Sequence, residues 1–153
     1  MPYFIMIALI AIDQGTKFLI TSHFEIGTDH ILLPFLSFRL LYNEGVAFSL
    51  LEGKTTFLIV FTSIALLALI GVQVYMREQT HSKLIDYGLS LIVAGGIGNL
   101  IDRIWLGMVV DYISVGDRFP IFNFADICVC TGAGLIILYC LAEFRKEYKM
   151  VRK

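Results

Sequence analysis

The sequence predicts an all-α integral membrane protein with four transmembrane helices and a small extracytoplasmic β-sheet and loop region packed at the membrane surface. Of its 153 residues, 58% are hydrophobic and only 16% are charged, whereas soluble domains average about a quarter charged residues. The mean hydropathy is +0.79. The apolar residues are also concentrated in four long runs, and about 20 such residues are enough to cross a bilayer as a helix.

The four predicted spans differ in their polar content. Residues 55–76 form an uncharged run, whereas the spans 2–21, 84–103 and 122–142 contain ionisable residues. The run at 2–21 has no basic residues before it and no small-residue cleavage site after it, so it is predicted to be a retained span and not a signal peptide. The ionisable residues within the spans are Asp13, Lys17, Asp86, Asp102, Arg103 and Asp126.

Basic residues in the connections predict the orientation of the spans. The C-terminal segment 143–153 holds five Lys and Arg residues and the loop 77–83 holds two, whereas the segments 22–54 and 104–121 together hold three. Because short cytoplasmic segments are enriched in basic residues, we expect a single membrane domain over 1–153 with both termini cytoplasmic. Segment 22–54 is rich in aliphatic and aromatic residues with short alternation, which predicts a small sheet at the outer surface.

A net charge of −1 leaves no basic face that could follow a phosphate backbone, so a nucleic-acid partner is not expected.

Ionisable residues inside a span cost several kcal/mol on insertion scales and therefore indicate either function or a satisfied ion pair. Asp13 and Lys17 are four residues apart, acid first, which predicts an ion pair on one helix face. Gly15 between them is expected to allow close backbone approach. Asp102 is expected to have the neighbouring Arg103 cation and the Asn99 amide within reach, since the three residues share a helix face.

Small residues in the same span indicate a close contact with another helix. Ala94, Gly95, Gly96 and Gly98 form a pattern that allows helices in membranes to approach closely.

Asp111 and Asp126 differ from the other acids because neither has a cation nearby in sequence. Asn123 lies three residues before Asp126 and should share its helix face. If the fold brings the two acids together, desolvation and mutual repulsion would leave one protonated and one ionised. Such a pair can activate water against an amide, but a proton or ion relay that includes Asp13 and Asp102, and a buried polar scaffold, remain open interpretations.

Five motifs together resemble the lipoprotein signal peptidase family, also called signal peptidase II. They are, in chain order, DQGTK (13–17), NEGVAF (43–48), GGIGNLIDR (95–103), VVDY (109–112) and FNFAD (122–126). Their order, spacing and position in the spans match the family over essentially the whole chain. The VVDY motif ends in Tyr112, where the family more often has Phe.

The resemblance implies a role for each matching residue. Asp111 and Asp126 match a catalytic aspartate dyad. The matching residues that hold the substrate or support the dyad are Asn43, Gly45, Asn99, Arg103 and Asn123, with Asp102, Asp13 and Lys17 as the supporting framework.

The resemblance also implies the activity and its setting. A family member is an aspartic endopeptidase of the bacterial cytoplasmic (inner) membrane, with its active site near the extracytoplasmic face. Its substrate is a prolipoprotein that carries diacylglycerol, cleaved just before the lipid-bearing cysteine. The expected partners are these lipidated signal peptides, membrane lipids and globomycin-type cyclic peptide inhibitors. No metal or other cofactor is expected, and the protein is expected to act as a monomer.

Overall fold

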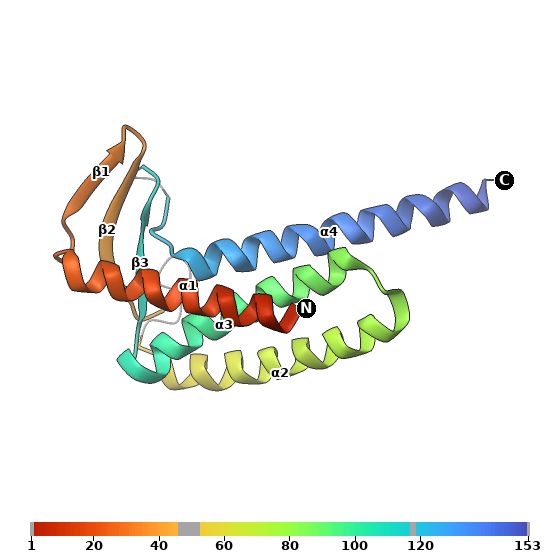
Figure 1. Ribbon diagram of the computed structural model, residues 1–153, viewed down its shortest axis with the longest axis horizontal. Helices are drawn as coiled ribbons and strands as arrows, with labels where there is room; N and C mark the ends of the chain where they lie inside the picture. The colour runs from red at the N-terminus through yellow and green to blue at the C-terminus, as the bar shows by residue number, and fades with distance from the viewer. Residues whose placement is uncertain (1, 46–52, 117–118, 153) are drawn as a thin grey trace.

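Four long helices form the body of the protein. The computed structural model describes residues 2–45, 53–116 and 119–152. The helices are α1 (Pro2–His23), α2 (Thr55–Thr80), α3 (Lys83–Leu106) and α4 (Phe124–Val151). All four are long and apolar enough to cross a membrane, which confirms the predicted fold class. Figure 1 shows them side by side, with a small sheet at one end.

Local capping signals mark the start of α4 and the end of α3. α4 starts after Asn123, whose side chain forms a capping box with Asp126. It continues to Val151, well past residue 142 where the predicted span stops, since the charged C-terminal segment contains good helix formers. α3 ends at Gly107, which has φ 78° and donates its N–H to the Arg103 carbonyl.

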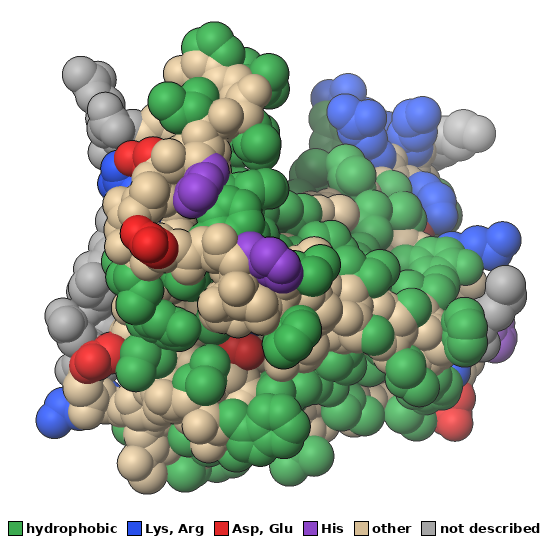
Figure 2. Space-filling view, turned by 60° about the vertical axis from the view of Figure 1, so that its left-hand side comes forward, with side chains coloured by type: hydrophobic (Ala, Val, Ile, Leu, Met, Phe, Trp, Pro, Cys, Tyr) green, Lys and Arg blue, Asp and Glu red, His purple; other side chains and the backbone are tan. Residues whose placement is uncertain are grey.

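α3 lies at the centre of the bundle. In its most apolar window 44% of the residues are buried, compared with 17–22% in the other helices. Large hydrophobic side chains on the outer faces stay exposed, as a lipid-facing surface requires. Figure 2 shows these apolar side chains over much of the molecule, with Lys and Arg gathered toward the end of α4.

Small residues allow α3 and α4 to pack closely, as predicted. A Cβ added to Gly95 would overlap the Ala125 carbonyl oxygen and lie 2.9 Å from Val129 Cγ2. Gly132 on α4 faces the backbone of Gly88 in the same way. The prediction for Gly15 is wrong: nothing lies within 4 Å of a Cβ built there, because that position does not face a neighbouring helix.

A three-stranded antiparallel sheet, in the order β1-β2-β3, covers one end of the bundle. Its strands are β1 (Asp29–Leu33), β2 (Leu36–Asn43) and β3 (Val109–Ser114). The predicted sheet in segment 22–54 is thus confirmed, and the third strand comes from the connection between α3 and α4. The buried residues that join the sheet to α1 are Ile20, Leu40, Val110 and Tyr112.

Register within the sheet brings a polar pair onto one face. Asn43 pairs with Val109, and Leu41 pairs with Asp111. Asn43 and Asp111 are therefore diagonal neighbours on the same side of the sheet, within reach of each other's side chains. Asn43 is also the first residue of the NEGVAF motif, whose residues 46–48 lie outside the described residues.

Candidate active site

Asp111 and Asp126 come together because the chain folds back between them. Asp111 lies on β3 and is 3% exposed. The Phe122 carbonyl, just before α4, accepts the N–H groups of Tyr112 at 3.0 Å and Ile113 at 2.7 Å. This pairing aligns the start of α4 with β3. The first turn of α4, which carries Asp126, therefore begins next to the strand that carries Asp111.

Side-chain amides connect the two carboxylates. Asn123 Nδ2 donates to Asp111 Oδ1 at 2.7 Å and to Asn99 Oδ1 at 3.0 Å. Asn99 Nδ2 in turn donates to Asp126 Oδ1 at 2.8 Å. From the sheet, Asn43 Nδ2 donates to Asp111 Oδ2 at 2.9 Å. Asp111 is therefore held by donors from β2 and the α4 N-cap, and Asp126 is held by a donor from α3.

Asp126 also serves the helix that carries it. Its Oδ2 accepts the Asn123 backbone N–H at 3.0 Å, and Asn123 Oδ1 accepts the Asp126 backbone N–H at 3.0 Å. A carboxylate in the first helical turn is also favoured by the helix dipole. Asn123 is thus the N-cap of α4 and not a residue within the span, and the capping box accounts for a carboxylate in an apolar run.

The environment of Asp111 makes its ionised form less favourable than it is in water. Burial raises the pKa of Asp111 to about 6, and the neighbouring Asp126 charge acts in the same direction. Hydrogen bonds from Asn43 and Asn123, and the Lys17 charge, act in the opposite direction. A buried carboxyl next to a second carboxylate is the arrangement in which one proton can be shared.

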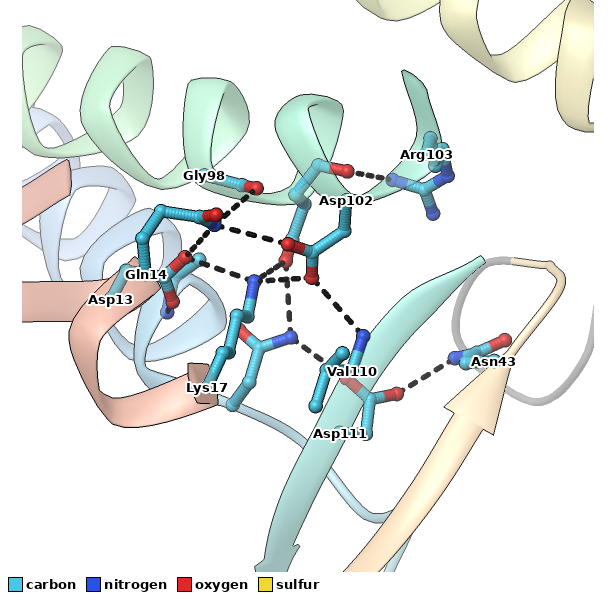
Figure 3. A network of polar contacts seen from close by, with 12 residues as sticks. Asp13, Gln14, Lys17, Asn43, Gly98, Asp102, Arg103, Val110 and Asp111 are labelled. Carbon is cyan, nitrogen blue, oxygen red and sulfur yellow. Dashed lines mark hydrogen bonds and ion pairs between the residues drawn. The ribbon is translucent and has the colours of Figure 1, made fainter. Parts of the chain in front are cut away.

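Lys17 joins two further buried carboxylates behind the site (Figure 3). Its Nζ lies 2.9 Å from Asp13 Oδ2 and 2.8 Å from Asp102 Oδ2, and all three side chains are almost fully buried. The predicted Asp13–Lys17 pair is confirmed. Arg103 interacts with Asp102 only electrostatically. The ion pair of Asp102 is made by Lys17 from α1, and Arg103 donates to the Gly45 carbonyl instead.

The Lys17 cluster holds the backbone next to each aspartate of the site. Asp102 Oδ2 accepts the Val110 N–H at 3.1 Å, one residue before Asp111. Asp13 Oδ1 accepts the Ala125 N–H at 2.9 Å, one residue before Asp126. Asp13 and Asp102 are therefore used in ion pairs and in backbone support, which leaves them poorly suited to a proton relay.

Gln14 belongs to this cluster, although the sequence reasoning missed it. Gln14 Nε2 donates to Asp102 Oδ1 at 3.0 Å, to the Gly98 carbonyl at 3.1 Å and to Asp13 Oδ2 at 3.2 Å. Gln14 thus supplies the side-chain amide beside Asp102 that helix spacing predicts for Asn99. Its place in the DQGTK motif, between Asp13 and Lys17, was the signal that could have indicated it.

Arg103 reaches the end of β2 and lies close to the paired aspartates. Its Nη2 donates to the Gly45 carbonyl at 2.7 Å, and the Gly45 N–H donates to Asn43 Oδ1 at 3.0 Å. Its Nε is buried and has no hydrogen-bond partner among the described residues. Its charge is also near enough to both Asp111 and Asp126 to interact with them.

The predicted absence of cations around Asp111 and Asp126 holds only in sequence. Arg103 from α3 and Lys17 from α1 both interact electrostatically with Asp111 in the folded chain. Neither makes an ion pair with Asp111 or Asp126 among the described residues, so their charges act at a distance. Among the residues that the structure describes, no group of three or more His, Cys, Asp or Glu side chains is arranged to hold a metal ion.

Comparisons with known proteins identify the family. The model of a family described as signal peptidase (SPase) II matches residues 5–142. The chain belongs to the signal peptidase II family. It is 38% identical over 152 residues to a lipoprotein signal peptidase of Halalkalibacterium halodurans, with 96% of each chain covered. It is 40% identical over 142 residues to that of Lactiplantibacillus plantarum, with 91% of this chain and 93% of the relative covered.

Solved structures agree with this membership. A bacterial membrane enzyme determined by the in meso method at 2.3 Å resolution has a TM-score of 0.85 and 36% identity, covering 94% of this chain and 88% of the other. A second such enzyme, at 1.9 Å resolution, has a TM-score of 0.80. The chain is therefore a multi-pass membrane protein of a peptidase family, as its motifs predict.

Proposed function

We propose that this chain is an aspartic endopeptidase that removes signal peptides from diacylglyceryl-modified prolipoproteins, cutting just before the lipid-bearing cysteine. The observation that carries the proposal is the connection of Asp111 to Asp126 through the Asn123 and Asn99 amides. Membership of the signal peptidase II family supports the substrate class. Lipoprotein signal peptidases are also the relatives that the chain resembles over nearly its full length.

In this mechanism the two aspartates divide the acid and base roles. We assign the shared proton to Asp111, because burial raises its pKa. Asp126 takes a proton from water while the water oxygen attacks the scissile carbonyl carbon, and Asp111 donates its proton to the carbonyl oxygen. When the intermediate collapses, the C–N bond breaks, Asp126 protonates the leaving amine and Asp111 regains its proton.

The surrounding polar residues hold the substrate backbone and support the pair. Arg103 is suited to bind a substrate carbonyl, since its buried Nε lacks a partner among the described residues and its guanidinium lies near both aspartates. The other residues that we expect to hold the substrate backbone or support the pair are Asn43, Gly45, Asn99 and Asn123. Asp13, Lys17 and Asp102 position the backbone behind it.

The substrate explains why such a site would sit at the end of a bundle. The hydrophobic part of a signal peptide and a diacylglyceryl chain both stay in lipid, so the scissile bond is presented at the membrane boundary. We place the sheet end of the bundle at the extracytoplasmic face of a bacterial inner membrane, with both termini cytoplasmic. The basic C-terminal part of α4 supports this orientation. Globomycin-type cyclic peptides would occupy the same site, and the protein would act as a single membrane domain and a monomer.

The decisive experiment is mass-resolved cleavage of a purified diacylglyceryl prolipoprotein, with and without globomycin. Wild type should cut only before the lipid-bearing cysteine. Asp111→Asn and Asp126→Asn should each leave a folded protein without measurable turnover. Asp29→Asn, which alters an exposed acid paired with Arg39 on the sheet, is the matched control and should retain turnover. Cleavage at another bond would refute the substrate, and near-normal turnover by either site variant would refute the aspartate pair.

A further inference from the structure

The residue that follows Asp111 makes a side-chain hydrogen bond to α1. Tyr112 is 4% exposed, and its hydroxyl donates to Thr16 Oγ1 on α1 at 3.0 Å. Thr16 Oγ1 in turn donates to the Asp13 carbonyl at 2.8 Å. The Thr16 hydroxyl therefore accepts one hydrogen bond and donates another, and β3 is joined to the middle of α1.

The same part of α1 is joined to α4. Asp13 Oδ1 accepts the Ala125 N–H at 2.9 Å, and Ala125 directly precedes Asp126. The path from Tyr112 through Thr16 and Asp13 to Ala125 thus connects the residue after one aspartate with the residue before the other. It runs behind the site, separate from the amides that connect the two carboxylates in front.

We propose that Tyr112 and Thr16 form a hydroxyl latch that positions Asp111 against Asp126 for peptide cleavage. Both are positioning residues, since they act through the backbone next to the aspartates. The proposal rests on the proposed function, because it needs Asp111 and Asp126 to be the reacting pair. Beyond that function, the proposal names two residues that set the position of Asp111 relative to Asp126.

The hydroxyl, and not the aromatic ring, is the part of Tyr112 that makes this connection. The ring packs edge-to-face against Phe38, with ring centroids 6.0 Å apart. Phenylalanine at position 112 would keep this packing and lose the hydrogen bond to Thr16, together with the interaction of the hydroxyl with the Phe124 backbone at the start of α4. The backbone pairing of β3 with Phe122 would also remain, so Tyr112→Phe should fold while β3 gains freedom to move relative to α1.

The test compares Tyr112→Phe, Thr16→Val and the double variant in cleavage of a purified diacylglyceryl prolipoprotein. Thr16→Val should lower kcat about fivefold, the size expected for one buried hydrogen bond, and Tyr112→Phe should lower it at least as much, with little change in KM. The double variant should be no slower than Tyr112→Phe alone, because both changes break the same connection. Thr16→Ser, which retains a hydroxyl, should keep most of the wild-type kcat.

Two matched controls separate the latch from a general loss of hydroxyl groups. Tyr42→Phe removes a tyrosine hydroxyl from the neighbouring strand β2 within the same apolar cluster. Thr21→Val removes a threonine hydroxyl from α1 that bonds only to carbonyls of its own helix among the described residues. Both should cleave at the wild-type rate.

The pH profile supplies a readout that a purely structural role would not change. Among the described residues, the charged groups that interact with Asp111 are Asp126 on α4, Lys17 on α1 and Arg103 on α3. If β3 loosens, Asp111 gains water and moves from Asp126, and both changes lower its pKa. The limb of the kcat profile that belongs to Asp111 should therefore move to lower pH in Tyr112→Phe and stay in place in Tyr42→Phe.

The outcomes distinguish the latch from the function on which it rests. If wild type does not cleave the lipidated substrate, the proposed function fails. If wild type cleaves and Tyr112→Phe matches it in kcat and pH profile, the function stands and the latch is refuted. Additive losses in the double variant would also refute the latch, since they would show that the two hydroxyls act separately.

Discussion

Replacement of Gly98 by alanine is expected to damage the site although this residue touches neither Asp111 nor Asp126. A Cβ built on Gly98 would overlap Asp13 Oδ2, lie 3.0 Å from Asp13 Cγ and lie 3.4 Å from Ala125 Cβ. Asp13 is 1% exposed and has little room to move. Its carboxylate must therefore give up part of its contacts with Lys17 or with the Ala125 N–H.

The expected size of the effect follows from three contributions. Overpacking of a close contact costs about 1–3 kcal/mol. The loss of a hydrogen bond to a charged group costs about 1.5–3 kcal/mol. Alanine returns about 1 kcal/mol through its better helix propensity. Gly98→Ala should therefore lower the free energy of unfolding by about 3 kcal/mol and should also slow cleavage, because Ala125 precedes Asp126.

The assay is unfolding of purified protein in detergent, followed by cleavage of the lipidated substrate under conditions in which each variant is folded. Gly134→Ala is the matched control, since nothing lies within 4 Å of a Cβ built on that helical glycine. It should be neutral or slightly stabilising. Equal stability of Gly98→Ala and Gly134→Ala would refute the reasoning that the contact with Asp13 requires a glycine.

Three further predictions concern charges and caps. The raised pKa of Asp111, about 6, means that the folded state binds its proton more tightly, so stability falls as the pH rises from 3.8 through 6. The stability of Asp111→Asn relative to wild type should rise by about 1 kcal/mol between pH 5 and pH 8, and a constant difference in denaturation midpoints would contradict this. Asn123→Ala should lower the free energy of unfolding by about 1 kcal/mol through loss of the N-cap and should also lower turnover. Asn123→Ser, which can still cap the helix, should keep the thermal stability and lose only turnover. Equal melting temperatures of Asn123→Ala and Asn123→Ser would argue against the cap. Lys17→Met should cost about 3–5 kcal/mol by leaving Asp13 and Asp102 buried without their cation, and denaturant unfolding should show partial recovery when Asp102→Asn is added.

The local part of the architecture could be predicted from sequence because its causes are local. Long apolar runs indicate helices that cross a membrane, and the spacing of Asp13 and Lys17 indicates a pair on one helix face. The small residues of α3 likewise indicate a close helix contact. Such signals are properties of neighbouring residues and do not depend on which helix packs where.

Contacts between distant segments could not be predicted in the same way. Lys17 and Asp102 meet because α1 packs on α3, and Gln14 bonds to Asp102 for the same reason. β3 is held by the Val110 N–H, which bonds to Asp102. A short strand inside a connection of mixed composition has little periodicity of its own, and its partners in the sheet lie far away in sequence.

The cations that act on Asp126 come from residues distant in sequence. Lys17 Nζ donates to Asn99 Oδ1 at 3.0 Å, which directs the other end of that amide, Nδ2, toward Asp126. Asn99 Oδ1 also accepts from Asn123 Nδ2, the group that donates to Asp111. The positive charge is therefore one amide away from Asp126. It orients donors toward both carboxylates without forming an ion pair that would hold both of them ionised, and this leaves room for the proton that an aspartate pair must share.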